Sequence, residues 1–356
     1  QRLAAYLPGF LASFDEIYLL DLHGNSKKKE KAPDGGKDDN VFDIQQGVAI
    51  GLFVRKPGVK RWTGDRAKVF HADLYGLRKD KYRALDSLDI DSTDWRALAP
   101  AAPQYYFVPQ DTELLAEYER GWKVTEAMPV NSVGIVTARD SLSIHFDREV
   151  LWRTVTDFAA LPEEEAREKY ELGKDSQDWK VALAQQDLRR TGPDVSRVQP
   201  ILYRPFDTRY TYFTGQPGGF HCRPRGEVMR HMVSPNLALS TTRSTEIGGD
   251  FQHAFVASNL TTHHTTSLKE VNYHIPLWLY PSDQPADLIE AAQAERRPNL
   301  SDEFVAALKA AQGRAISPED TLAYLYAVLH TPGYRQRYAD FLRRDFPRVP
   351  LTSNKE

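Results

Sequence analysis

The sequence predicts a mixed α/β fold: an α/β lobe over roughly the first hundred residues, then a larger α+β domain that ends in a pair of helices. Two apolar runs near the N-terminus, residues 17–22 and 41–53, are typical of strands in a mostly buried sheet. Residues 200–281 are rich in Tyr, Phe, Thr and Arg and poor in helix formers, which indicates short strands. Two amphipathic segments after residue 317 predict the closing helices.

Composition places the chain among soluble globular proteins. Its 356 residues are 41% hydrophobic and 27% charged, and the prolines and glycines follow no period, which excludes a coiled coil or a helical bundle. No run of about 18 apolar residues occurs, so the sequence predicts no membrane span. The single cysteine, Cys222, cannot form an internal disulfide, which favours the reducing cytoplasm. A net charge of -3 argues against a chain that is polybasic overall.

The first residues indicate a fragment of a longer chain. The sequence begins at Gln1 without a starting methionine, and it lacks the charged and apolar pattern of a signal peptide. Apolar side chains already recur at helical spacing, at Leu3, Tyr6, Leu7, Phe10 and Leu11. Because an amphipathic helix is already under way there, we expect further chain upstream.

The N-terminal lobe is predicted to contain several strands and one exposed loop. Residues 17–22 (IYLLDL) form an almost uninterrupted apolar run, which is typical of a buried parallel strand. Residues 26–40 carry no large apolar side chain and include two adjacent glycines, so we expect an exposed, mobile loop. Further strands are predicted over 41–53, 68–75 and 104–108.

The second part of the chain is predicted to begin and end with helices. A helix is expected over 111–121, and residues 163–190, which are rich in Glu, Lys and Gln, are expected to be largely helical. Ser317 is a candidate N-cap with Pro318 at the first helical position. The buried stripe of that helix would be Leu322, Leu325, Tyr326 and Leu329. After Pro332 and Gly333 a second helix would bury Tyr334, Tyr338, Phe341 and Leu342.

Motifs for catalysis or metal binding are missing from the sequence. Neither CxxC nor HExxH occurs, and the adjacent His263 and His264 would face opposite sides of a strand, so no metal site is predicted. No GxSxG elbow occurs, and the glycine-rich stretch 215–219 lacks the lysine of a P-loop. A nucleophilic Cys222 is the alternative, because neighbouring arginines would lower its thiol pKa, but a lone cysteine among arginines is more often incidental. No catalytic residue is therefore assigned.

One segment combines arginines and aromatic residues in a way that suits nucleic acid. Between residues 201 and 265 the arginines outnumber the acids, although the chain as a whole is acidic. Arginine binds guanine edges and phosphates in a bidentate manner, and aromatic rings stack or wedge at bases. The candidate DNA-binding residues are Arg204, Arg209, Tyr210, Tyr212, Arg223, Arg225, Arg230 and Arg243, with Thr241, Thr242 and Asn259 as shorter candidates. The alternative is structural: the rings would build a β-rich core, and Arg204 and Arg209 would pair with nearby acids.

Long blocks of the sequence resemble Type ISP restriction-modification enzymes. FDEIYLLDLHGNSKKKE (residues 14–30) and VFDIQQGVAIGLFVRK (41–56) resemble the end of their adenine-N6 methyltransferase domain. ILYRPFDTRYTYFTG (201–215), RPRGEVMRHM (223–232) and the C-terminal block 320–352 resemble their C-terminal specificity domain. The blocks occur in the same order as in the family, and they are far longer than any short motif.

The resemblance implies a fold, a boundary and partners. Residues 1–110 would be the C-terminal part of the methyltransferase lobe, a remnant of a Rossmann-like sheet, and residues 111–356 the target-recognition domain. The chain would recognise a sequence in double-stranded DNA and direct adenine-N6 methylation and ATP-dependent cleavage. Methyltransferase, helicase-like and nuclease domains upstream in the same polypeptide would carry out those reactions. S-adenosylmethionine, ATP and Mg²⁺ would serve the full-length enzyme.

The sequence departs from the catalytic pattern of that family. It contains no Asn-Pro-Pro-aromatic or Asp-Pro-Pro-aromatic loop to hold a flipped adenine, and no glycine-rich turn suited to the cofactor. We therefore expect no cofactor in this chain and no catalysis by it alone. Two alternatives stay open: a stand-alone adenine-specific DNA methyltransferase-like protein, and a non-catalytic protein-interaction domain.

Overall fold

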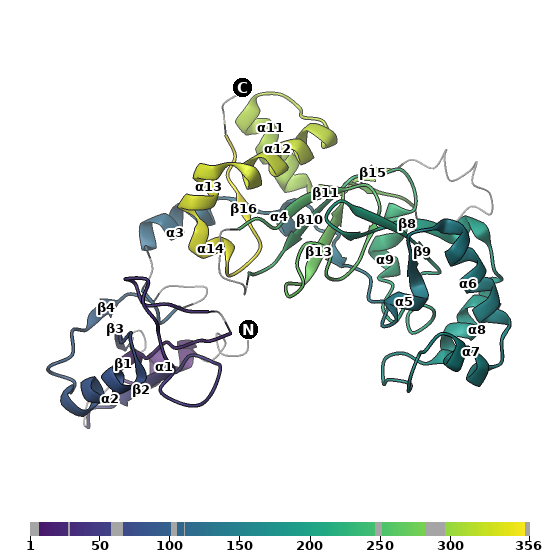
Figure 1. Ribbon diagram of the computed structural model, residues 1–356. Coiled ribbons are helices and arrows are strands. Elements are labelled where there is room, and N and C mark those ends of the chain that lie inside the picture. Colours follow the sequence, from purple (N-terminus) through teal and green to yellow (C-terminus); the bar gives the residue numbers. More distant parts are fainter. Residues whose placement is uncertain are drawn as a thin grey trace. The chain divides into compact units, whose positions relative to one another are not determined.

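The computed structural model describes residues 7–27, 29–57, 67–100, 105–109, 111–245, 251–281 and 296–352. It divides into two compact units, Gln1–Leu115 (unit 1) and Ala116–Glu356 (unit 2), whereas the boundary predicted from the sequence lies between residues 110 and 111. Each unit combines helices and small sheets, so the predicted mixed α/β class is confirmed (Figure 1). Among the described residues, no helix is long and apolar enough to cross a membrane.

Unit 1 is built on a four-stranded sheet with the strand order β2-β1-β3-β4. The central strand β1 pairs in parallel with β3 and antiparallel with β2, so the parallel strand predicted over 17–22 is confirmed. Helices α1 and α2 accompany the sheet (Figure 1). The bounds are α1 Leu7–Ser13, β1 Glu16–Asp21, β2 Ala49–Val54, β3 Lys68–Asp73, α2 Arg78–Ser87 and β4 Arg96–Leu98.

Two of the strands predicted for unit 1 were wrong in extent or place. The strand predicted over 41–53 is regular only in β2, because Asn40 accepts a hydrogen bond from the N–H of Phe42 and bends the chain there. Residues 105–108, the described part of the strand predicted over 104–108, form no strand. The fourth strand is β4 instead, which pairs antiparallel with β3. Of the helix predicted from Leu3, residues 1–6 lie outside the described residues.

The segment predicted as an exposed, mobile loop is tied down at its C-terminal end. The Lys81 ammonium of α2 lies 2.7 Å from the Asp38 carboxylate, and both side chains are fully buried. Lys81 also donates to the carbonyls of Leu22 and Asp39, and Asp38 accepts from the N–H of Gly24. A buried ion pair with this many hydrogen bonds leaves no charge unsatisfied. The segment is therefore fixed to α2 although its lysines and glycines are mostly exposed.

His23 ties the same segment to the sheet. Its Nδ1 lies 2.9 Å from Glu30, its Nε2 lies 2.9 Å from Asp73, and its ring stacks on Tyr75 with the centroids 3.8 Å apart. Both ring nitrogens can satisfy carboxylates only as donors, which requires the imidazolium form. Burial lowers the pKa of His23, but the hydrogen bonds to Asp73 and Glu30, with the charge of Asp21, raise that pKa above its ordinary value.

The described residues of unit 2 form two four-stranded sheets and two short strand pairs. The first sheet has the order β12-β8-β9-β7, and the second has the order β11-β10-β13-β6. The β-rich texture predicted for residues 200–281 is confirmed, since β8 to β14 fall almost entirely in that range. The bounds are β5 Trp122–Lys123, β6 Ser132–Val133, β7 Ile144–His145, β8 Val198–Arg204, β9 Asp207–Tyr212, β10 Ala238–Thr242, β11 Ala254–Ala257, β12 Leu260–Thr261, β13 Asn272–Pro276, β14 Trp278–Leu279, β15 Arg297–Pro298 and β16 Arg348–Val349.

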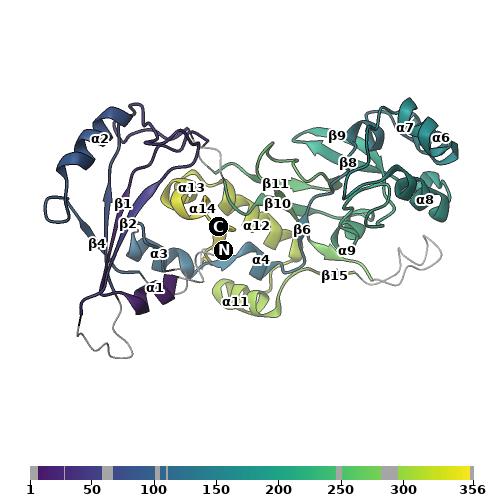
Figure 2. The same ribbon diagram turned by 90° about the horizontal axis from the view of Figure 1, so that it is seen from below.

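The helices of unit 2 gather at two ends of its sheets. Helices α6 to α8 pack beside β8 and β9, whereas α11 to α14 lie toward the other end, in both views (Figures 1 and 2). The helix predicted over 111–121 is confirmed as α3. The helical bounds are α3 Thr112–Glu119, α4 Val124–Ala127, α5 Asp140–Ser143, α6 Arg148–Ala160, α7 Glu163–Lys169, α8 Val181–Thr191, α9 Gly226–Met229, α11 Asp302–Gln312, α12 Pro318–His330, α13 Pro332–Arg337 and α14 Ala339–Leu342.

Residues 163–190, predicted to be largely helical, form two helices, because a core contact interrupts the segment. Helix α7 stops at Lys169, and the chain turns through Glu171 and Gly173, both with positive φ, before α8 begins. The turn delivers Trp179 into the core, where the side chain is 1% exposed and its Nε1 donates to the carbonyl of Phe220. Burial of a large ring with its polar atom satisfied outweighs the helix propensity of the segment.

The first of the two predicted C-terminal helices, α12, is confirmed, whereas the second differs from the prediction. Ser317 accepts a hydrogen bond from the N–H of Asp320 and caps α12, with Pro318 at the first turn, as predicted. Leu322, Leu325 and Leu329 of the predicted stripe are buried. The second helix is divided into α13 and α14 at Tyr338, and α11 was not predicted.

Replacing Lys81 by methionine is expected to destabilise unit 1 by about 3–5 kcal/mol, because the buried Asp38 carboxylate would lose its counter-charge. Hydrogen exchange of the amides in β1 and β3 measures the free energy of opening. The matched control is Lys79→Met on the same helix, where the lysine is exposed and the effect should stay within about 0.5 kcal/mol. Equal exchange in both variants would contradict the role of the ion pair.

Raising the pH above neutrality is expected to weaken unit 1 through His23. The folded-state pKa of His23 lies above its unfolded value of about 6.5, so the stabilisation by the bound proton is fully present below that value. It is lost as the pH rises through the folded-state pKa. Hydrogen exchange of β1 and β3, corrected for the intrinsic effect of pH, should show this loss, and His23→Gln should abolish it. The same pH dependence in both proteins would rule out this role of His23.

Candidate nucleic-acid interface

The hairpin between β8 and β9 presents an aromatic ring at its tip. Arg204 pairs with Asp207 in the strand register, so only Pro205 and Phe206 form the turn. Phe206 has a φ of 64° and is 97% exposed. A phenylalanine side chain stabilises a fold mainly by being buried, and this exposed ring contributes almost no such stabilisation. The turn therefore holds an aromatic ring out into solvent.

Arg209 organises the side chains behind this tip. Its guanidinium makes a bidentate contact with Asp207, with Nη2 2.8 Å from Oδ2 and Nε 3.0 Å from Oδ1. Its Cζ lies 4.0 Å from the ring centres of both Phe146 and Tyr203. Phe146, just after β7, is itself 70% exposed. A guanidinium held by a carboxylate and by two rings has little freedom, so Asp207, Arg209, Phe146 and Tyr203 form a rigid group, here called the Arg209 clamp.

Tyr203 connects the Arg209 clamp to α5. Its hydroxyl donates to the Asp140 carboxylate at 2.9 Å, and Thr137 donates to the same carboxylate. Burial raises the pKa of Tyr203, and the hydrogen bond to Asp140 raises that pKa further, so the phenol stays neutral. Arg204 lies with its Cζ 4.1 Å from the centre of the Tyr203 ring and donates to the Tyr203 carbonyl. Arginine and aromatic side chains therefore alternate on this surface.

The connection that follows β12 lies against the same strand. Thr262 Oγ1 donates to the Tyr203 carbonyl at 3.1 Å, and Thr265 Oγ1 donates to the Leu202 carbonyl at 2.9 Å. Gly134 permits the close approach of the β6 segment to this connection, because a Cβ there would lie 2.1 Å from the Thr262 carbonyl oxygen. Segments more than fifty residues apart in sequence thus meet beside the hairpin.

Positive and ionisable groups gather along that connection. Burial lowers the pKa of His263, and nearby groups lower this pKa further, namely His264, Arg225 and Arg223. Arg223 is more than half exposed, and its 3.2 Å ion pair with the exposed Asp178 is of a kind that contributes little. The buried Nε of Arg225 has no hydrogen-bond partner within the part of the chain that the structure describes. Arg223 therefore has exposed donors to offer a ligand, whereas the unpartnered Nε of Arg225 lies inside the fold.

Of the aromatic and arginine candidates, Tyr212 serves the fold instead, which corrects that part of the assignment, whereas Tyr210 and Arg230 are partly buried and stay predictions. Tyr212 is fully buried, and its hydroxyl lies 3.0 Å from the N–H of Asp194, so it cannot reach a DNA surface. Tyr210 is partly buried against the core around α6 and α8. Arg230 donates to the carbonyls of Tyr280 and Pro281.

The candidates on and around β10 also do not join the hairpin surface. Arg243 lies 3.1 Å from Asp345, which follows α14. Thr241 and Thr242 are buried, and Asn259 is partly buried in the turn before β12. Four of the predicted residues, Arg204, Arg209, Arg223 and Arg225, lie on the hairpin or beside the connection after β12, and among them Arg223 is the most exposed. Their contact with DNA stays a prediction.

Sequence reasoning missed two members of this surface. Phe146 lies about sixty residues before the hairpin, and no local pattern marks it as a partner of Arg209. Phe206 stands inside the RPFD block, and its exposure follows only from the turn that carries it. The Pro-Phe pair between two β-like runs was the available signal, since it marks a two-residue turn.

The thiol and the metal-like cluster do not suggest catalysis. Burial raises the pKa of Cys222, contrary to the activation that its arginine neighbours suggested. Among the described residues, Asp21, His23 and Asp73 have the mutual spacing of metal ligands. The ring nitrogens of His23 are already engaged with carboxylates, which favours an imidazolium without a lone pair for a metal. The close spacing of these three side chains follows from the hydrogen bonds that hold unit 1 together.

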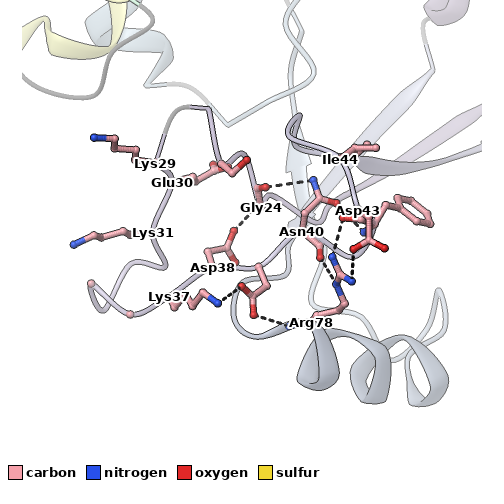
Figure 3. Close-up of a pocket in the computed structure, with 15 residues that line it drawn as sticks. Gly24, Lys29, Glu30, Lys31, Lys37, Asp38, Asn40, Asp43, Ile44 and Arg78 are labelled. Atoms are coloured by element: carbon pink, nitrogen blue, oxygen red, sulfur yellow. Dashed lines mark hydrogen bonds and ion pairs between the residues drawn. The ribbon is translucent and has the colours of Figure 1, made fainter.

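A pocket of about 660 Å³ in unit 1 is also explained by local structure (Figure 3). It is lined by the loop between Gly24 and Ile44 together with Arg78. The guanidinium of Arg78 contacts Asp43 and donates to the carbonyls of Asn40 and Phe42, so it has no free edge for an anion. Lysines and acids alternate around the rim. The rim therefore carries charges of both signs.

Comparison with solved structures shows the fold. A DrdV–DNA complex gives a TM-score of 0.64 at 21% identity, covering 98% of this chain and 34% of the other. A nuclease-deletion mutant of the Type ISP restriction-modification enzyme LlaGI with a DNA substrate mimic gives 0.59 at 20%, covering 99% and 32%. The ATP-dependent Type ISP restriction-modification enzyme LlaBIII bound to DNA gives 0.65 at 18%, covering 98% and 23%. The chain thus spans between about a quarter and a third of each.

Comparison with family profiles identifies the larger part of the chain. No curated protein matches it significantly. Residues 126–356, which are nearly all of unit 2, match the profile of the Type ISP C-terminal specificity domain. This match extends over well more than half of the sequence and includes the hairpin, the Arg209 clamp and the arginines near His263. The chain therefore belongs to the family of Type ISP C-terminal specificity domains.

Proposed function

We propose that the chain is a sequence-specific recognition module for double-stranded DNA. The observation that carries the proposal is the open surface of arginine and aromatic side chains at the β8–β9 hairpin, inside a domain that belongs to a specificity family. Arginine guanidinium groups form bidentate hydrogen bonds with guanine edges and phosphates, and aromatic rings stack on bases. The solved structures of similar fold contain DNA or a DNA mimic, which supports the same interpretation.

Unit 1 is proposed to be the C-terminal part of an adenine-N6 methyltransferase lobe, a remnant of a Rossmann-like sheet. Its parallel β1–β3 pair is compatible with that origin. Recognition by unit 2 would direct adenine-N6 methylation and ATP-dependent cleavage by methyltransferase, helicase-like and nuclease domains of the same polypeptide. S-adenosylmethionine, ATP and Mg²⁺ would act in those domains, in the cytoplasm.

Selection from a randomised duplex pool tests the recognition function. Bound DNA is sequenced after selection at about 50 and 200 mM salt, since phosphate contacts weaken steeply over that range and base contacts supply specificity. We expect one short asymmetric sequence to be enriched and to persist at the higher salt. Binding without any enrichment, abolished at the higher salt, would overturn the proposal.

The double variant Arg223→Ala, Arg225→Ala is expected to weaken binding to the selected duplex by about 1–3 kcal/mol for each base that an arginine no longer touches. If one of them binds phosphate, the dependence of affinity on salt should also become shallower by about one unit of slope. The matched control is Arg343→Ala, Arg344→Ala after α14. A fall in thermal stability with unchanged affinity would show that Arg223 and Arg225 are structural.

A further inference from the structure

We propose that Phe206 and the open face of Phe146 stack on DNA bases, so that the β8–β9 hairpin tip is an aromatic contact to an unstacked base step. This proposal rests on the proposed function and adds aromatic stacking to the contacts that the arginines would make. Neither ring was among the candidate contact residues, and both are tied to the same ion pair: Phe146 contacts Arg209, and Phe206 directly precedes Asp207.

The backbone at the tip favours a role for Phe206 outside the fold. Proline in the first turn position and a positive φ in the next are typical of a type II turn, which normally takes glycine or asparagine there. The turn here is Pro205–Phe206, with a φ of 64° at Phe206. Left-handed backbone is unfavourable for a bulky residue, and such conformations gather at ligand clamps. A glycine would fit this turn with less strain, so the fold alone gives no reason for a phenylalanine.

The exposure of both rings points the same way. Phe206 is 97% exposed and Phe146 is 70% exposed, more than the other large apolar side chains that the structure describes, apart from Leu268. An exposed ring contributes little to the stability of the chain that carries it. We therefore infer that the two rings become buried, with a gain in free energy, when a partner covers them.

The support behind the rings is rigid. One face of Phe146 lies against the Arg209 guanidinium, whose Cζ is 4.0 Å from the ring centre. Arg209 is fixed in turn by the bidentate contact with Asp207, the residue directly after Phe206. A ring held in one position before binding loses little entropy when a ligand stacks on it. The clamp thus holds Phe146 by one face, and its member Asp207 directly follows the hairpin tip.

The surrounding charge selects the partner. Arg204 lies two residues before Phe206, with its guanidinium over the Tyr203 ring, so a cation flanks the exposed rings. Aromatic rings interleaved with arginines match bases flanked by phosphates, and apolar side chains wedged at a base step kink duplexes in known modes of binding. A protein partner would be the other occupant of such a surface, and the experiment below separates the two.

The test uses the 356-residue chain and the duplex obtained by selection, with 2-aminopurine placed in turn at each position. Phe206→Gly removes the ring and suits the positive φ, so its melting temperature should equal or exceed that of the unaltered chain. We expect its affinity for the duplex to fall by about 5- to 150-fold, as for loss of one stacked base. Its salt dependence should stay unchanged, because the substitution removes no charge.

The spectroscopic signal is independent of affinity. At saturating protein, the unaltered chain should change the 2-aminopurine fluorescence at one base step, Phe206→Gly should abolish that change, and Phe206→Tyr should restore it. Phe146→Ala should weaken binding in the same direction. The control is Leu183→Ala, which removes an exposed apolar side chain from α8 and should alter neither quantity.

The possible results of this experiment lead to different conclusions. Specific binding by Phe206→Gly with unaltered affinity and fluorescence would overturn this inference and leave the proposed function standing, with a protein partner as the occupant of the rings. A lower melting temperature in Phe206→Gly would show that the ring is structural. Failure of the unaltered chain to select any sequence would overturn the proposed function, and the inference with it.

Discussion

The bidentate contact between Arg209 and Asp207 is the interaction on which the candidate interface depends. A guanidinium is planar, so its edge can hold a carboxylate while its two faces carry rings. Arg209 binds Asp207 through its edge, and its Cζ lies 4.0 Å from the ring centres of Phe146 and Tyr203. Tyr203 transmits the constraint to Asp140, and its carbonyl receives the connection after β12. One ion pair therefore positions side chains from four separate segments.

The core beneath this surface supplies the rigidity that the surface needs. The strands β8 and β9 pack on helices α6 and α8, and Trp179 is buried with its indole N–H satisfied by a carbonyl. Tyr212 belongs to the same core and holds β9 from behind. A surface that is ordered before binding loses little entropy when a ligand arrives. Within β9 burial increases toward the C-terminal end, since Arg209 and Tyr210 are partly buried whereas Thr211 and Tyr212 are fully buried.

The two units use charge in different ways. Unit 1 buries an ion pair, Lys81 with Asp38, and satisfies the remaining donors with backbone carbonyls. Unit 2 leaves its arginines partly exposed and pairs them with rings or with weak, solvent-screened acids. A buried pair specifies the conformation of its own loop, whereas exposed arginines remain available to a ligand. The chain is acidic overall, yet this local arrangement can still attract phosphate.

The sequence by itself determined the α/β class, the parallel strand at β1, the β-rich region after residue 200, the capped helix α12 and the family resemblance. These features depend on local periodicity, capping and long blocks of residues, which can be read along the chain. Only the tertiary structure decided which candidates are open. Tyr212 is buried and Arg209 is clamped by Phe146, because strand pairing sets which face each residue takes and brings distant segments together. The exposure of Phe206 was likewise decided by a turn and not by its residue type.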